Sequence, residues 1–222
     1  MNVQNHTLTQ SSETLVARSG AYAMLSALFS PPYTETFRLL LNEQDSQSLP
    51  SSCELLDPGL GVMAREVFEA IHRSDIEEEY VKVFGHTVSR DVSPYELEFQ
   101  KNKEVFSMTQ ALADINGFYQ AFGLQLDVHE RADHISVEAE FISYLLWKQA
   151  LAVENEQPEN ADICAGAYQA FQRDHFQSWA QDFARKLNNS SDSQFYRLAS
   201  GFLLHLLELN TPRREEPGVL SQ

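Results

Sequence analysis

Apolar residues recur at helical spacing along most of the chain, and the clearest case begins just after Asp133. A stripe of side chains three or four positions apart follows there, namely Ile135, Ala139, Ile142, Leu146 and Ala150. This spacing puts the apolar side chains on one face, as in a helix packed against a core. Asp133 is a residue type that accepts hydrogen bonds from the free N–H groups at a helix start. We therefore predict a long helix from His134 to about residue 153, capped by Asp133.

Similar patterns, divided by proline and by capping residues, predict helices before that segment. A first helix begins near Ser12 and ends at Pro31, because proline supplies no N–H and restricts the residue before it. The run Ser93-Pro94-Tyr95-Glu96 combines serine, proline and glutamate at the positions that favour a helix start. It predicts a long helix that continues to about Phe122. Residues 42–59 are polar and contain Ser, Gln, Pro and Gly, so they are predicted to form a loop.

The whole pattern predicts an all-α, single-domain helical bundle of about ten helices over residues 12–210. No segment shows the sustained alternation that is typical of a half-buried strand. Near the end of the chain, Asp174 is predicted to cap a separate helix that carries Trp179 and Phe183. Residues 1–11 and 211–222 are predicted to be flexible tails. The connection at residues 124–132 is a candidate hinge between two helical halves.

Composition and charge narrow the classes of function. The chain has 222 residues, 43% of them hydrophobic, which is enough for one domain with a sizeable core. Its 32 acidic and 16 basic residues give a net charge of −16. This charge argues against nucleic-acid binding and against anionic membrane surfaces, and it favours a basic partner if the partner is charged at all.

Cysteine content and hydropathy indicate a cytoplasmic protein. The two cysteines, Cys53 and Cys164, do not make a disulfide framework or a metal motif. The first residues are polar and lack the apolar region of a secretory signal, and no stretch is apolar enough to span a membrane. We therefore expect a cytoplasmic location and no stable membrane insertion.

The start of the long helix at Asp133 carries the candidate chemistry. His134 and Glu138 are spaced i,i+4 and share a helix face, so a base with a carboxylate partner is one interpretation. A metal site that adds His175 or His129 is another. The simpler interpretation is a capped helix start, because acidic residues are common in first turns. No nucleophile elbow, phosphate loop or dinucleotide fingerprint supports catalysis.

A third interpretation is a groove that binds a peptide. The aromatic residues of the predicted helix that opens at Ser74 and includes Tyr80 and Phe84 are packing residues by default. If they instead line a groove beside the acidic helix start, that groove would suit a peptide that is basic at one end and apolar along its body.

Four stretches, in order along the chain, resemble one family: the TorD/DmsD/NarJ-like redox-enzyme maturation chaperones, the cytoplasmic helpers of molybdopterin oxidoreductases. They cover roughly residues 15–208. Each stretch is weak alone, and the four together are fairly specific. The stretches are Glu79-Tyr80-Val81-Lys82-Val83-Phe84, Ser93-Pro94-Tyr95-Glu96, Glu130-Arg131-Ala132-Asp133-His134-Ile135 with Glu138-Ala139-Glu140-Phe141, and His175-Phe176-Gln177-Ser178-Trp179 through Phe183.

The resemblance implies a non-enzymatic chaperone that needs no cofactor. Such proteins bind the twin-arginine signal peptide of an apo-molybdoenzyme catalytic subunit, the body of that subunit, or both. They hold the client until the molybdopterin cofactor is inserted, and so delay its export. The net charge of −16 fits a ligand with two arginines, because an acidic rim raises the association rate of a basic ligand.

The resemblance also implies which residues meet the client. It assigns the signal peptide to Asp133 and His134, carboxylates for arginine to Glu130 and Glu138, and the apolar side of the groove to Tyr80, Val83, Phe84 and Tyr95. Some members carry proline just before the Asp-His pair, where this chain has Arg131 and Ala132. Hinge stiffness and peptide preference are therefore expected to differ here.

Two alternatives remain at the level of sequence. One is a metal-dependent helical enzyme that uses His134, Glu138 and His175. The other is an assembly adaptor for an oxidoreductase subunit that is not exported. The resemblance is compatible with a monomer or with a domain-swapped homodimer, and the connection at 124–132 is a natural place for the exchange.

Overall fold

A computed structural model describes residues 11–42, 45–85, 92–101, 104–126 and 130–210 of the protein. Within these ranges the chain forms ten α-helices and no β-strand, apart from one isolated bridge between Tyr95 and His134. No described helix has the length and hydropathy needed to cross a membrane. The predicted all-α bundle is confirmed. The helices are α1 (Ser12–Phe29), α2 (Glu35–Arg38), α3 (Asp45–Leu56), α4 (Pro58–Ile71), α5 (Ile76–Phe84), α6 (Val105–Ala121), α7 (Ile135–Glu154), α8 (Pro158–Phe171), α9 (Gln177–Ser190) and α10 (Gln194–Asn210).

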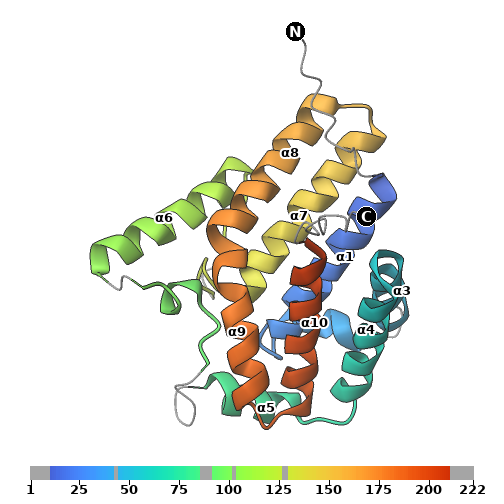
Figure 1. Ribbon diagram of the computed structural model, residues 1–222, viewed down its shortest axis with the longest axis vertical. Coiled ribbons are helices and arrows are strands. Elements are labelled where there is room, and N and C mark those ends of the chain that lie inside the picture. Colours follow the sequence, from blue (N-terminus) through green and yellow to red (C-terminus); the bar gives the residue numbers. More distant parts are fainter. Residues whose placement is uncertain (1–10, 43–44, 86–91, 102–103, 127–129, 211–222) are drawn as a thin grey trace, which may run out of the picture.

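Helix α1 lies at the centre of the bundle, between α7 on one side and α3 and α10 on the other (Figure 1). Small residues let α1 and α7 approach closely. The Ser19 hydroxyl donates to the Ser143 carbonyl oxygen at 2.9 Å, and the Ser143 hydroxyl donates back to the Ser19 carbonyl oxygen at 2.9 Å. These reciprocal bonds hold α1 and α7 in register, and they leave neither serine hydroxyl unpaired.

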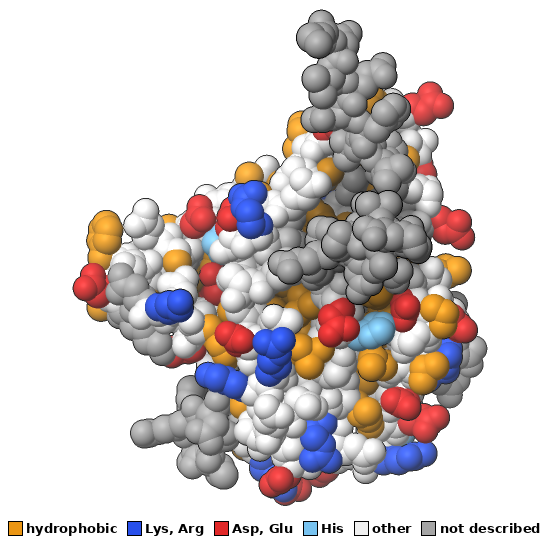
Figure 2. Space-filling view, viewed as in Figure 1, with side chains coloured by type: hydrophobic (Ala, Val, Ile, Leu, Met, Phe, Trp, Pro, Cys, Tyr) orange, Lys and Arg blue, Asp and Glu red, His pale blue; other side chains and the backbone are white. Residues whose placement is uncertain are grey.

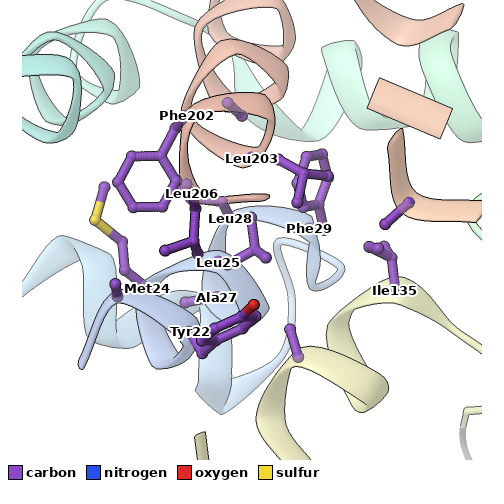
Figure 3. Close-up of a cluster of buried hydrophobic side chains, with 14 of the residues drawn as sticks. Tyr22, Met24, Leu25, Ala27, Leu28, Phe29, Ile135, Phe202, Leu203 and Leu206 are labelled. Atoms are coloured by element: carbon purple, nitrogen blue, oxygen red, sulfur yellow. The ribbon is translucent and has the colours of Figure 1, made fainter. Parts of the chain in front are cut away.

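The core is built from large side chains of α1 and α10 (Figure 3). Phe29 is fully buried and its ring contacts Phe183 of α9 and Tyr196 of α10, with ring centroids 5.3 and 6.5 Å apart. Tyr22 is also fully buried, and its hydroxyl accepts hydrogen bonds from Gln172 and Asn210 at 2.6 and 2.7 Å. The Tyr22 ring therefore packs in the core while its buried hydroxyl keeps its hydrogen-bond partners.

The predicted break before Asp174 is wrong. Helix α8 continues through a π-helical segment, Gln172–Phe176, directly into α9. Asp174 lies on the exposed side and pairs with Arg173. The wider π turn points Gln172, His175 and Phe176 inward, and all three are buried. Such bulges are often found at functional sites because they re-aim side chains without ending a helix.

The loop predicted for residues 42–59 is also wrong, because Asp45–Leu56 forms α3 and packs against α1 and α4. Leu49, Cys53 and Leu56 are spaced i, i+4 and i+7, and Cys53 is fully buried. The serines and Pro50 around them obscured a short amphipathic pattern in an otherwise polar stretch.

The helix predicted from Ser93 to Phe122 is shorter than expected. Ser93–Tyr95 is extended, a single 3₁₀ turn covers Glu96–Glu98, and α6 begins only at Val105. No helix begins at Ser93, because the backbone of this segment instead forms hydrogen bonds with residues 133–135. Helix α6 projects from the bundle, and its outer end carries Val105 and Phe106 at 81% and 79% exposure (Figures 1 and 2).

Truncation of Phe29 tests the packing of α1. We expect Phe29→Ala to lower the free energy of unfolding by ~3–5 kcal/mol, since it removes a fully buried ring and leaves a cavity. Val16→Ala on the same helix is the control: its side chain is 47% exposed and the loss should be about 1 kcal/mol or less. Urea denaturation followed by circular dichroism measures both. Equal losses for the two variants would contradict a core centred on α1.

Candidate functional site

Two sequence motifs that lie far apart in the chain pair through their backbones. The Glu96 N–H donates to the Asp133 carbonyl oxygen at 2.9 Å, and the Ile135 N–H donates to the Pro94 carbonyl oxygen at 2.8 Å. The bridge between Tyr95 and His134 lies between these two bonds. The structure thus brings the Ser93–Glu96 stretch directly against the start of α7.

Asp133 does not cap α7, contrary to the prediction. The cap is His134, whose Nδ1 accepts the Ser136 N–H at 3.2 Å. Asp133 lies one residue earlier and turns its carboxylate the other way, where Oδ2 accepts the Leu97 N–H at 3.2 Å. The Asp133 carboxylate also receives two hydrogen bonds from Arg131, at 2.9 and 2.8 Å. It therefore joins the Glu96–Glu98 turn to the connection before α7 and does not cap a helix end.

His134 is a buried, neutral imidazole. Burial and, to a smaller extent, the charge of Arg131 lower its pKa to about 3. Because Nδ1 accepts the Ser136 N–H, the ring proton of the neutral form belongs on Nε2. The ring has no exposed surface and stacks edge-on against Tyr95, with centroids 5.2 Å apart. Its place is structural, at the point where the two backbones meet.

A second buried cluster lies deeper, around Glu138. Glu138 Oε2 accepts the Trp179 indole N–H at 3.0 Å, and the side chain has no exposed surface. Burial raises the pKa of Glu138 well above its ordinary value, and the neighbouring carboxylate of Glu96 raises it further. Glu138 therefore holds a proton more tightly than an exposed glutamate does.

His175 is the counter-group of this cluster. Burial lowers the pKa of His175, but the carboxylates of Glu96 and Asp114 raise it by more, so the net direction is upward. His175 Nδ1 lies 3.3 Å from Glu96, and Nε2 lies 3.3 Å from Asp114. Glu138, Glu96 and His175 thus form one buried cluster of ionisable side chains.

The same geometry does not assemble the metal site considered from the sequence. Glu138 is engaged with Trp179, whereas His175 contacts Glu96 and Asp114. Across the described ranges, no three or more His, Cys, Asp or Glu side chains are arranged to hold a metal ion. His129 lies outside the described residues.

The aromatic residues predicted to form a groove wall are mostly packing residues. Val83 is buried, and Phe84 packs on Tyr196 and Phe183 with ring centroids 5.0 and 6.4 Å apart. Tyr80 packs on Phe84 and is half-buried. Burial raises the pKa of Tyr80, and the nearby charge of Glu130 raises it further. Only the outer edge of this aromatic group therefore approaches the acidic stretch.

Tyr95 lies beside Glu130, and both side chains are half-buried. Its hydroxyl donates to Glu130 Oε1 at 3.2 Å, and the same oxygen accepts the Arg131 N–H at 2.9 Å. Burial and, to a smaller extent, the charge of Glu130 raise the pKa of Tyr95 to about 12. The phenol is therefore a neutral donor that holds Glu130 in place.

Glu130 also lines a groove of about 660 Å³, which is within the size range of ligand sites. The groove lies between the turn after α1, the chain after α6 and the first turns of α7. Its walls are largely aromatic and aliphatic. Three carboxylates line it, and none of the described residues that line it is Lys or Arg. The side chains that matter most are Tyr33, Glu35, Glu130, Glu140, Phe141 and Tyr144.

Of the eight residues that the sequence assigned to client binding, Glu130 lines this groove. Asp133, His134 and Glu138 have no exposed surface, so they lie behind the groove and not in it. The sequence reasoning missed Glu35, because it is the first residue of α2, about a hundred positions before Glu130. Glu140 belongs to the Glu138–Phe141 stretch but was not assigned to client binding. Because residues two positions apart lie on different faces of a helix, the sequence did indicate that Glu140 and Glu138 point in different directions.

Comparison with known proteins decides the family. Residues 43–185, well over half of the chain, match the family described as nitrate reductase delta subunit. The chain belongs to this family. It is the family of NarJ- and TorD-type maturation chaperones, so the resemblance drawn from the four motifs is confirmed.

A curated relative is similar over most of its length. The chlorate reductase assembly chaperone protein of Ideonella dechloratans is 24% identical over 173 residues, which cover 77% of each chain. The matched family region contains both the Ser93–Glu96 stretch and the start of α7. The contact between these two segments therefore lies within the part of the chain that defines the family.

Glu138→Gln tests the protonation of the buried cluster. Because the pKa of Glu138 is higher in the folded protein than in the unfolded chain, the protonated group stabilises the fold at low pH. This stabilisation is lost as the pH rises from the unfolded pKa of a glutamate toward the folded pKa. Glutamine keeps an oxygen for Trp179 and cannot ionise. We expect the stability of Glu138→Gln relative to the wild type to rise between pH 5 and pH 8, by up to about 1.4 kcal/mol per pH unit.

Urea denaturation at several pH values measures the difference. Glu66→Gln, an exposed position on α4, is the control and should give a difference that does not change with pH. If Glu138→Gln also gives a constant difference, Glu138 is already ionised in the folded protein.

Proposed function

We propose that the protein is an assembly chaperone for a molybdopterin oxidoreductase, and that it binds the twin-arginine signal peptide of the catalytic subunit in the groove at Glu130. Family membership supports the assembly role, and the relative from Ideonella dechloratans is itself called an assembly chaperone. The observation that carries the proposal is the groove, which combines an apolar wall with three carboxylates.

The groove and this ligand are complementary in charge. Glu35, Glu130 and Glu140 line it, and the chain as a whole carries a net charge of −16. Glu35 already pairs with Arg38, so Glu130 and Glu140 are the stronger candidates for the peptide arginines. Arginine pairs with carboxylates in a bidentate manner, and an acidic rim speeds the encounter with a basic peptide.

The apolar wall suits the segment that follows the two arginines in such a leader. Phe141 and Tyr144 project from one face of α7, and Tyr33 extends from the turn after α1 with 73% of its surface exposed. Thr34 fixes this turn, because its hydroxyl donates to the Pro31 carbonyl oxygen at 2.7 Å and caps α2. The groove is thus formed by anchored elements, which lowers the cost of ordering it on binding.

In the free protein Asp133 and His134 act as positioning residues for the groove. Both are buried behind the groove, and they hold the Tyr95 segment against the start of α7. Replacement of both by alanine is expected to weaken peptide binding. Because their hydrogen bonds join distant segments, it is also expected to lower the melting temperature. Circular dichroism melts separate a loss of binding from a loss of the fold.

Isothermal calorimetry with a twin-arginine signal peptide tests the groove. We expect the triple variant Glu35→Gln, Glu130→Gln and Glu140→Gln to bind about tenfold more weakly, since three rim carboxylates contribute about 0.2–1 kcal/mol each. Glutamine at position 130 keeps an oxygen acceptor for the Tyr95 hydroxyl and the Arg131 N–H. Binding of the variant should also depend less on salt.

The matched control removes the same charge elsewhere. Glu66, Glu159 and Glu208 are exposed positions on α4, α8 and α10, and their replacement by glutamine should leave affinity nearly unchanged. Equal weakening of the two triple variants would show that net charge, and not the groove, attracts the peptide. If the wild type binds no twin-arginine leader but does bind the apo-enzyme without one, the protein acts on the body of its client. If it binds neither, the proposed function is wrong.

A further inference from the structure

The guanidinium of Arg131 is held in the way that proteins hold an arginine ligand. Its Nε and Nη2 atoms donate to the two carboxylate oxygens of Asp133, at 2.9 and 2.8 Å. Its Cζ atom lies 4.3 Å from the centroid of the Tyr95 ring, which places the cation over the aromatic face. Bidentate pairing combined with stacking is specific for guanidinium, because a lysine ammonium has neither the fork nor the flat face.

The receptor side of this contact does not depend on Arg131. The Leu97 N–H holds the Asp133 carboxylate, and the Glu96 N–H holds the Asp133 carbonyl oxygen. The Tyr95 hydroxyl is bonded to Glu130. Asp133 and Tyr95 are therefore kept in position by the pairing of the two backbones, whichever guanidinium lies between them.

Arg131 itself is the exposed partner of the pair. Its side chain is 44% exposed, whereas the side chain of Asp133 has no exposure. Arg131 belongs to the connection before α7 and to no helix. Burial raises the pKa of Asp133 although Arg131 opposes this, so the carboxylate needs a cation beside it. An exchange of one guanidinium for another preserves that pairing, whereas simple departure of Arg131 would not.

The contact adjoins the groove through Glu130. This residue lines the groove with its side chain and bonds both the Tyr95 hydroxyl and the Arg131 N–H. We propose that Asp133 and Tyr95 form a guanidinium site which Arg131 fills in the free protein, and that an arginine of the client peptide takes its place in the complex. The site itself stands on the contacts above, and the identity of the incoming arginine rests on the proposed function.

Such an exchange makes Arg131 a selectivity device. A peptide arginine enters the site only by displacing Arg131. The apparent affinity for the peptide is therefore reduced by the ratio of filled to empty sites in the free protein. A lysine cannot replace the bidentate, stacked guanidinium and would leave Arg131 in place. The protein would thus discriminate between arginine and lysine more strongly than an acidic groove alone can do.

Chemical rescue tests the site without any client. Arg131→Ala empties it, so the melting temperature should fall, and millimolar methylguanidinium should restore it by about 2 °C or more. Sodium chloride and methylammonium chloride at the same ionic strength should restore less. The wild type and the double variant Arg131→Ala with Asp133→Asn should show no rescue. Absence of rescue in Arg131→Ala, or equal rescue by methylammonium, overturns the guanidinium site.

Peptide binding tests the exchange. Arg131→Ala should bind a twin-arginine peptide about tenfold more tightly than the wild type, since the internal competitor is gone. The same peptide with two lysines should change by less than about threefold. Arg131→Lys should fall between wild type and alanine for the twin-arginine peptide. Unchanged or weaker binding by Arg131→Ala overturns the exchange. If neither protein binds any leader peptide, the proposed function fails, and the rescue experiment alone decides whether the guanidinium site exists.

Discussion

A carboxylate that is removed from water must be paired, hydrogen-bonded or protonated, and the centre of this bundle meets that requirement three times. Asp133 is paired with Arg131 and held by the Leu97 N–H. Glu96 lies against His175, and Glu138, whose pKa is raised by burial, accepts the Trp179 indole N–H. Because each solution uses a residue from another segment, these bonds tie the 93–98 segment to α7 and to the π turn before α9. The groove lies on the surface of this arrangement.

In this arrangement, few residues both join distant segments of the chain and line the groove. Glu130 is the exception, since it holds Tyr95 from the side and lines the groove with the same carboxylate. His134 is buried and acts on the groove through the two segments that it joins, whereas Asp133 both joins them and holds the Arg131 guanidinium. A family motif can therefore include residues that never touch a ligand, because what it preserves is a junction between two segments of chain.

Helical periodicity was sufficient to predict α7. The stripe from Ile135 to Ala150 marked its face, and its ends agree with the structure to within a residue or two. Local signals failed where distant backbone groups compete with them. Ser93–Glu96 is typical of a helix start, but bonds from Pro94 and Glu96 to residues 133–135 keep it extended. The groove could be predicted only in part, because Glu35 and Glu130 come from distant segments and no spacing relates them.

The hydrogen bond from Trp179 to Glu138 has a practical consequence. The chain has two tryptophans, and Trp147 is 47% exposed whereas Trp179 is buried. An indole that donates to a carboxyl group emits differently when that group gains or loses its proton, because the nearby charge shifts the energy of the excited state. With Trp147 replaced by phenylalanine, the emission of Trp179 would report on the protonation of the central cluster. The protein thus contains its own optical probe at the junction that supports the groove.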